Sequence, residues 1–158
     1  MKKLTIIAGL LLASTSIFAQ SHPIKLSLRG SLTLPTGDWK LGQTTGGLLE
    51  FQANKPLSDN FSLFASVGYG RFAGKDYADG TGILPILAGL NFDGPVFHAG
   101  LGFGYTNLIG AFTVGGFTFR PEVGVNLSKK LQLNVNYTSV KITNSNVNYI
   151  GITPVFKF

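Results

Sequence analysis

The sequence contains no cysteine among its 158 residues, and charged residues make up only 13% of it. The absence of cysteine excludes disulfide frameworks and thiolate metal sites. Soluble domains carry about 25% charged residues, so this chain has little charge for a surface that faces water. Hydrophobic residues reach 44%, and the length allows one domain of ordinary size.

Clusters of functional groups are also missing. The formal net charge is +6, but lysines and arginines do not gather with interleaved aromatic residues, which is the usual footprint of a nucleic-acid-binding surface. We therefore expect no nucleic-acid partner. The sequence shows no histidine cluster, catalytic carboxylate pair or aspartate-rich loop, so we expect no metal, no cofactor and no enzymatic activity.

Long apolar runs are absent except at the start of the chain. Residues 1–19 have a basic head, an apolar run over residues 4–12 and a small-residue tail, which is the layout of a secretory signal peptide. The alternative is a membrane anchor, which needs about 20 apolar residues; this run is shorter. We predict cleavage after Ala19 and export of residues 20–158 as one domain.

After Pro23 the dominant pattern is an alternation of apolar and polar residues with a period of two, which is typical of β-strands. In the stretch IKLSLRGSLTL, isoleucine and leucines alternate with lysine, serines, arginine and threonine. Eight strands are predicted, with no helix between them: residues 24–34, 44–54, 61–70, 82–92, 96–105, 113–127, 131–137 and 147–158.

The lengths of strands and loops favour a membrane-spanning barrel. A tilted strand needs about 9–11 residues to cross a bilayer, close to the predicted lengths. Short turns should alternate with mostly longer outer loops, as in outer-membrane barrels. The predicted short turns are residues 55–60, 93–95 and 128–130, and the predicted outer loops are residues 35–43, 71–81, 106–112 and 141–146. We predict an all-β fold, an eight-stranded antiparallel up-and-down transmembrane β-barrel, with both termini on the periplasmic side.

Charge separates the two faces of the predicted strands. The apolar face carries no charged residue, while the other face carries all the strand charges together with many Gly, Ser and Asn residues. A barrel whose apolar face meets lipid has this arrangement. A soluble lipocalin-like carrier would reverse it, although Gly37-Asp38-Trp39 resembles the lipocalin Gly-x-Trp motif at a different place in the fold.

Four charged residues are predicted to meet inside the barrel, because each lies near the middle of its strand on the polar face: Arg29, Glu50, Arg120 and Glu122. Two cations and two anions at one depth would neutralise each other, since an unpaired buried charge is costly. The lumen of an eight-stranded barrel is just wide enough to be filled by side chains. We expect a salt-bridge plug; the alternative is a gate whose pairs exchange partners and pass small ions.

Other residues on the polar face have predicted places in the lumen. Lys25 and Lys157 should sit together at the periplasmic mouth, and His98 should be a hydrogen-bonding residue near the same end rather than a catalytic one. The glycines of residues 100–104 leave one wall without side chains. They give room for a large residue opposite: Phe64, Leu87 or Tyr149.

Aromatic residues sort by strand end, as expected of the girdles at the two membrane interfaces. Tyr69, Tyr105 and Tyr137 form the predicted outer girdle. The periplasmic girdle is Phe61, Phe92, Phe97, Phe156 and Phe158.

The closing strand, residues 147–158, should pair with residues 24–34 so that no edge is left open in lipid. Pro154 lacks a ladder donor, so we expect a bulge or a missing hydrogen bond there, and the same at Pro121.

The chain resembles the outer-membrane protein β-barrel domain family, the small eight-stranded OmpA/OmpX-type barrels. The resemblance rests on the FAQ signal end, LPTGDW after the first strand and YIGITPVFKF at the end. It implies a location in the outer membrane of a Gram-negative-type envelope. It also implies assembly by the barrel-assembly machinery, which would read Phe158 as its signal.

Three functions remain open at this level. The leading hypothesis is a monomeric structural or surface-interaction barrel whose partners are outer-membrane lipid and, during insertion, the assembly machinery. The second is a narrow channel for small solutes or ions, and the third is a soluble periplasmic lipocalin-like carrier. The apolar stretch TNLIGAF, residues 106–112, is a predicted outer loop that could touch lipid or a hydrophobic partner.

Overall fold

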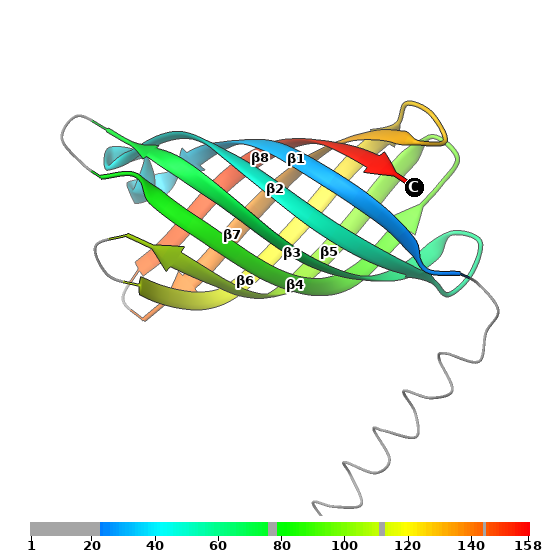
Figure 1. The fold of residues 1–158 in the computed structure, drawn as a ribbon, viewed down its shortest axis with the longest axis horizontal. Helices are drawn as coiled ribbons and strands as arrows, with labels where there is room; N and C mark the ends of the chain where they lie inside the picture. The colour runs from blue at the N-terminus through cyan, green and yellow to red at the C-terminus, as the bar shows by residue number, and fades with distance from the viewer. Residues whose placement is uncertain (1–22, 76–78, 111–112, 144) are drawn as a thin grey trace, which may run out of the picture.

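The computed structural model describes residues 23–75, 79–110, 113–143 and 145–158. The predicted signal peptide, residues 1–19, lies outside the described residues. The described chain forms eight long strands and one short 3-10 helix, η1 (Figure 1). Their bounds are β1 Lys25–Thr36, η1 Gly37–Leu41, β2 Gln43–Pro56, β3 Phe61–Gly74, β4 Thr81–Asp93, β5 Phe97–Ile109, β6 Thr113–Asn126, β7 Leu131–Ile142 and β8 Ser145–Lys157.

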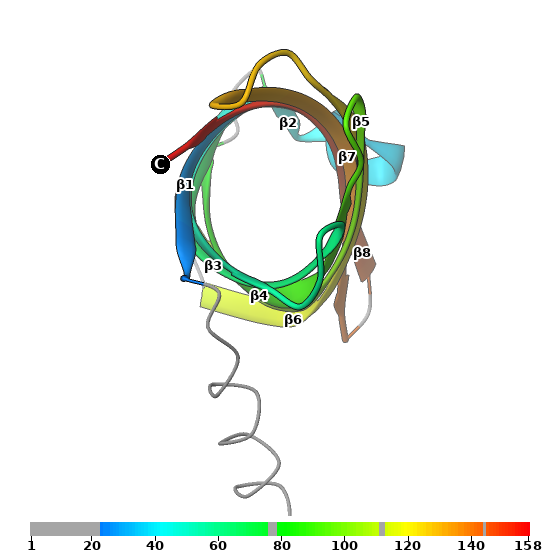
Figure 2. The same cartoon turned by 90° about the vertical axis from the view of Figure 1, so that its right-hand side faces the viewer.

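The eight strands close into one antiparallel ring in which each strand pairs with its neighbours in sequence (Figure 2). β1 closes the ring by pairing with β8, from Ser27 opposite Lys157 to Thr36 opposite Asn148. The backbone N–H of Phe158 also donates to the carbonyl of Leu26 over 2.9 Å. The predicted up-and-down barrel with a first-to-last seam is confirmed.

The sequence-based prediction was wrong about the lengths of the outer loops, and it did not include the short 3-10 turn of η1. β5 continues through most of the TNLIGAF stretch to Ile109, and β7 continues to Ile142. Glycine, threonine and asparagine made these segments resemble loops, but in a closed ring each strand end still has a partner on both sides. After Thr36, residues Gly37–Leu41 form the single turn of η1, which starts at Gly37 with a φ of 61°.

Proline interrupts the ladder without shifting it. β1 and β8 pair at Arg29–Val155 and again at Leu32–Ile152 in the same register, and the gap between them contains Pro154. The β6–β7 ladder has the same kind of gap at Pro121, between Phe119–Ser139 and Glu122–Asn136. The predicted missing hydrogen bond is therefore favoured over a bulge, because a proline removes one donor without adding a residue. A third gap, which was not predicted, lies in the β3–β4 ladder and contains Pro85.

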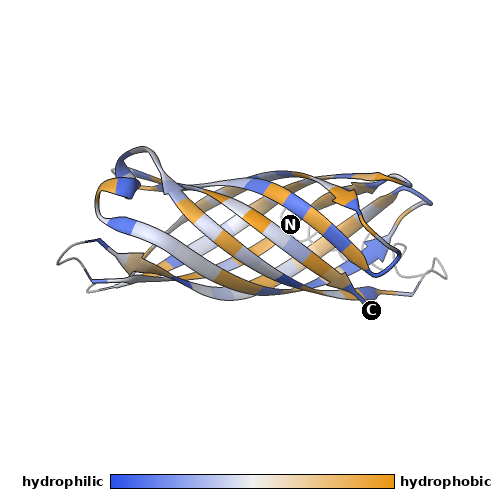
Figure 3. Cartoon of the chain, turned by 90° about the horizontal axis from the view of Figure 1, so that it is seen from above, coloured by the Kyte–Doolittle hydropathy of each residue, from blue (hydrophilic) through white to orange (hydrophobic). Residues whose placement is uncertain are grey.

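The apolar face of every strand points outward, and the polar face points into the ring (Figure 3). On β8, for example, Ile150, Ile152 and Phe156 are exposed, while Thr153 and Val155 are buried. This is the lipid-facing arrangement predicted from the charges and the reverse of a soluble lipocalin-like barrel. No helix in the described part of the chain is long and apolar enough to cross a membrane.

Candidate functional site: the lumen and its two ends

The middle of the lumen holds the four charged residues predicted to meet there. Arg29 and Glu50 are directly opposite each other on β1 and β2. Arg120 and Glu122 point inward from β6, where they pair with Gly102 and Gly100 of β5. All four side chains are almost fully buried: Arg29 and Glu50 are 1% exposed, Arg120 3% and Glu122 7%.

The strongest ion pairs cross the lumen instead of joining strand neighbours. Arg120 Nη1 lies 2.7 Å and 2.8 Å from the two carboxylate oxygens of Glu50. Arg29 binds Glu122 with both terminal nitrogens, Nη1 at 3.0 Å from Oε1 and Nη2 on Oε2. The neighbouring pair, Arg29 Nε and Glu50 Oε2, is 3.7 Å apart. Two positive and two negative groups are thus linked into one neutral layer, which we call the charge layer.

His98 extends the charge layer toward the barrel end that holds Lys25 and Phe158, which we call the periplasmic end after the predicted orientation. Its Nε2 lies 3.0 Å from Glu122 Oε1 and its Nδ1 lies 3.0 Å from Asp93 Oδ1. Lys157 Nζ reaches the same Asp93 oxygen at 3.2 Å. The alternating pattern predicts His98 in the lumen but does not mark Asp93, because a strand-end aspartate followed by Gly-Pro looks like an ordinary turn residue.

The ring of Phe64, on β3, reaches across β4 into the space that the glycines of β5 leave open. A Cβ at Gly102 would lie 3.1 Å from Phe64 Cζ, and one at Gly89 would lie 2.8 Å from Phe64 Cε1. Of the three side chains predicted for this space, Phe64 is the one that lies against Gly102. Side-chain volume that β5 lacks is supplied by β3.

The outer end of the lumen is apolar, a feature that the alternating pattern did not predict. Buried apolar side chains from six strands form a cluster that we call the outer cap: Leu48, Phe72, Ile83, Leu108, Val140, Val147 and Tyr149. The sequence does contain a signal for this cluster. Along the inward face, charged and amide residues are replaced by apolar residues near the outer ends of the strands.

Trp39 of η1 packs onto the outer cap. Its ring centroid lies 4.3 Å from that of Phe72 and 6.0 Å from that of Tyr149. The turn of η1 therefore folds the only tryptophan of the chain over the outer end of the lumen. This gives the GDW motif a role unrelated to lipocalins.

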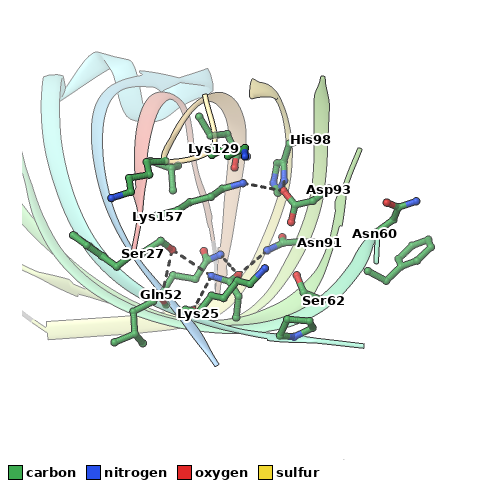
Figure 4. A pocket seen from close by; sticks show the side chains of 18 of the residues that line it. Lys25, Ser27, Gln52, Asn60, Ser62, Asn91, Asp93, His98, Lys129 and Lys157 are labelled. Atoms are coloured by element: carbon green, nitrogen blue, oxygen red, sulfur yellow. Dashed lines mark hydrogen bonds and ion pairs between the residues drawn. The ribbon is translucent and has the colours of Figure 1, made fainter. Parts of the chain in front are cut away.

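The periplasmic end is hollow. A cavity of about 560 Å³, which we call the vestibule, is lined by both predicted mouth residues, Lys25 and Lys157, and reaches inward to Arg29. The close view in Figure 4 shows Lys157 directed at Asp93. The two lysines thus share this mouth, but Lys157 has a carboxylate partner and Lys25 is exposed.

The predicted girdle residues all point outward. Tyr69, Tyr105 and Tyr137 are exposed, and β3, β5 and β7 continue beyond them toward the outer end. The first charged outward residues follow past two of these tyrosines, Arg71 on β3 and Lys141 on β7. Tyrosines are enriched at membrane interfaces, so this arrangement is the one expected of an outer girdle, which stays a prediction.

Phenylalanine rings gather at the other rim. The ring centroids of Phe61 and Phe92 are 5.1 Å apart, and those of Phe92 and Phe97 are 5.2 Å apart. Phe158, the predicted assembly signal, is 77% exposed at the same end.

No group of three or more His, Cys, Asp and Glu side chains among the described residues is arranged to hold a metal ion. The contacts in the described lumen are ion pairs and hydrogen bonds.

Comparison with known proteins gives one family and a set of similar barrels. The family model described as "Putative MetA-pathway of phenol degradation" matches residues 4–151. None of the curated proteins compared with the chain matches it.

Among solved structures, the chain is similar to Ail, the attachment invasion locus protein of Yersinia pestis, at 9% identity and a TM-score of 0.59, over 85% of this chain and 97% of that one. It is similar to the N-terminal β-barrel domain of Pseudomonas aeruginosa OprF at 10% identity and a TM-score of 0.63, over 85% and 97%. It is also similar to neisserial surface protein A at 12% identity and a TM-score of 0.60, over 85% and 95%.

At such low identities the likeness concerns the fold. It confirms the predicted resemblance to small eight-stranded outer-membrane barrels. Together with the apolar outer wall, it places the protein in the outer membrane of a Gram-negative-type envelope.

Proposed function

The chain belongs to the protein family described as the putative MetA-pathway of phenol degradation, and from this premise we propose that it is a non-enzymatic, monomeric outer-membrane barrel closed to ions. Its role is structural or one of surface interaction. The family description refers to a degradation pathway, and our proposal assigns the barrel no catalytic step in it. The partners of the barrel are outer-membrane lipid and, during insertion, the barrel-assembly machinery.

The observation that carries the proposal is the stacking of two unlike layers in one narrow lumen. The charge layer is neutral and almost fully buried, so an entering ion would have to displace a bonded partner from an arginine or a glutamate. The outer cap lies nearer the outer end and consists of apolar side chains. It supplies no groups that replace the hydration shell of an ion, and dehydration without such groups is costly.

The short outer connections support a limited surface role. β5 ends at Ile109 and β6 begins at Thr113, while β7 ends at Ile142 and β8 begins at Ser145. Such connections leave little chain for a protruding binding domain. An interaction at the cell surface would therefore use the strand ends themselves, with η1 and the outward cations near them.

A narrow passage for small solutes is the second candidate function. The observation that favours it is the vestibule, which penetrates from the periplasmic end as far as Arg29. Only the charge layer and the outer cap then separate the two sides. The passage would have to open by exchange of partners within the charge layer together with movement of the cap.

Planar-bilayer conductance of the purified protein tests both candidates. We expect no discrete ion current from the natural barrel at any applied voltage. Phe72→Ala/Tyr149→Ala removes the bulk of the cap, and Glu50→Ala/Arg120→Ala removes one cross-lumen pair. Because the layers are in series, each double variant should stay silent and their combination should conduct.

Heat-modifiable migration on gels verifies that every variant is folded before its current is measured. Discrete single-channel currents from the natural protein would reject the closed barrel in favour of the passage. Conduction by either double variant alone would show that only one of the two layers forms the seal.

A further inference from the structure

The vestibule is a built polar cavity that closure of the barrel does not require, since the two sealing layers lie beyond it. Its volume of about 560 Å³ falls within the range of about 300–1,000 Å³ typical of small-molecule sites. Figure 4 shows side chains from several strands pointing into this one space. Its buried wall is polar and its rim is positively charged.

The wall is a network of amides and hydroxyls. Gln52 Nε2 donates to Asn54 Oδ1 over 2.7 Å, and Asn91 Nδ2 donates to the same oxygen over 3.1 Å. Asn54 Nδ2 donates in turn to Ser27 Oγ over 3.3 Å. These bonds link β1, β2 and β4 and hold the three amide planes in fixed orientations before any ligand arrives.

Two polar atoms of this wall have no partner in the protein. Ser62 and Asn91 are directly paired across β3 and β4, and both line the vestibule. Ser62 is 7% and Asn91 2% exposed, yet Ser62 Oγ and Asn91 Oδ1 make no hydrogen bond. Leaving buried polar atoms unbonded costs about 1–3 kcal/mol each, so this adjacent pair favours a hydrogen-bonding occupant.

The rim is positively charged. Four lysines line the vestibule, Lys25, Lys129, Lys130 and Lys157, against two aspartates, Asp59 and Asp93. Asp93 is already engaged by His98 and Lys157. The remaining positive charge would attract an anion and would repel a metal cation.

We propose that the vestibule binds a small phosphorylated polyol, such as a sugar phosphate, from the periplasmic side. The phosphate lies among the lysines of the rim, since lysine ammonium groups bind phosphate as point charges. The hydroxyls of the ligand lie against Ser62 and Asn91, because a hydroxyl both donates and accepts and so satisfies both unbonded atoms.

Isothermal titration calorimetry of the full barrel in detergent micelles tests the proposal, with glucose 6-phosphate as the probe. We expect saturable binding that weakens with salt, and at least tenfold weaker binding of glucose or inorganic phosphate alone. Lys25→Gln and Lys129→Gln should each weaken binding by up to about fivefold, the scale of an exposed ion pair. Asn91→Ala should weaken it by about tenfold through the lost hydrogen bond.

Matched controls lie at the other end of the barrel. Lys40→Gln in η1 and Lys75→Gln after β3 remove the same charge far from the vestibule and should leave the binding constant unchanged. Heat-modifiable migration shows whether Asn91→Ala remains folded, and the exposed lysine variants keep the test decisive if it does not. The proposal is overturned if glucose 6-phosphate does not bind at millimolar concentration. It is also overturned if phosphate alone binds as tightly, or if the outer lysine variants weaken binding as much as the rim variants do.

Discussion

At the scale of single residues, the sequence predicts which charged residues lie in the lumen, but it does not predict which of them form ion pairs. Strand parity places Arg29, Glu50, Arg120 and Glu122 inside, and neutrality follows from the two signs. Which arginine meets which glutamate depends on side-chain reach across the ring, so Arg29 contacts Glu122 more closely than its ladder neighbour Glu50.

Removing one member of a cross-lumen pair should therefore cost more than removing both. Glu50→Ala leaves Arg120 without the carboxylate at 2.7 Å, and breaking a buried pair costs about 3–5 kcal/mol. The double variant Glu50→Ala/Arg120→Ala leaves no unpaired charge from this pair, so it should lose less than either single variant. Urea unfolding of the barrel in lipid vesicles measures each free energy of unfolding.

Asp38→Ala in exposed η1 serves as the control and should change the free energy of unfolding by less than about 0.5 kcal/mol. Additive losses from Glu50→Ala and Arg120→Ala would mean that the pair does not act as a unit.

At the scale of the strand, an alternating pattern was enough to predict eight elements and the face that each presents to lipid. Strand ends were harder to predict, because composition alone cannot distinguish a loop from a paired extension such as Thr106–Ile109. The outer cap was missed for a related reason. Inward apolar residues such as Ile83 and Val140 look like ordinary strand residues until closure of the ring brings them together.

Depth along a single strand should set the cost of a charge on the outer wall. Leu101 and Ile109 of β5 both face outward and are 38% and 39% exposed. Leu101 lies beside Gly102, which pairs with Arg120 of the charge layer, whereas Ile109 lies past Tyr105 at the outer end. Leu101→Arg should cost about 2–4 kcal/mol and Ile109→Arg about 0–1 kcal/mol.

Unfolding in lipid vesicles measures both variants of β5, and Ile109→Arg is the matched control for the added charge. Equal costs at the two positions would contradict the placement of Tyr105 near the outer interface.

At the scale of the whole molecule, one seam decides whether the sheet has an edge in lipid. β1 and β8 come from opposite ends of the barrel sequence, and their ladder carries the gap at Pro154. Beyond the ladder, the N–H of Phe158 bonds to Leu26. Two alternating stretches and the need for closure were enough to predict this seam. That the register stays the same across Pro154 could not be predicted, because it depends on the residues paired on both sides of the gap.

The side chain of Phe158 should matter for assembly more than for the stability of the finished barrel. It is 77% exposed, and the seam uses only its backbone N–H, which Phe158→Ala retains. We therefore expect Phe158→Ala to lower the amount of barrel inserted in the outer membrane of cells while leaving the free energy of unfolding within about 0.5 kcal/mol of the natural value. Heat-modifiable protein in membrane fractions reports insertion, and urea unfolding in vesicles reports stability.

Phe156→Ala is the matched control for this last change, since Phe156 faces outward on the same strand and is 51% exposed. This variant loses a ring two positions earlier but keeps Phe158. If Phe158 is the signal, Phe156→Ala should insert more normally than Phe158→Ala. A Phe158→Ala barrel that inserts normally would reject the assigned signal. A Phe158→Ala barrel that inserts poorly and is also unstable in vesicles would instead make the ring part of the seam.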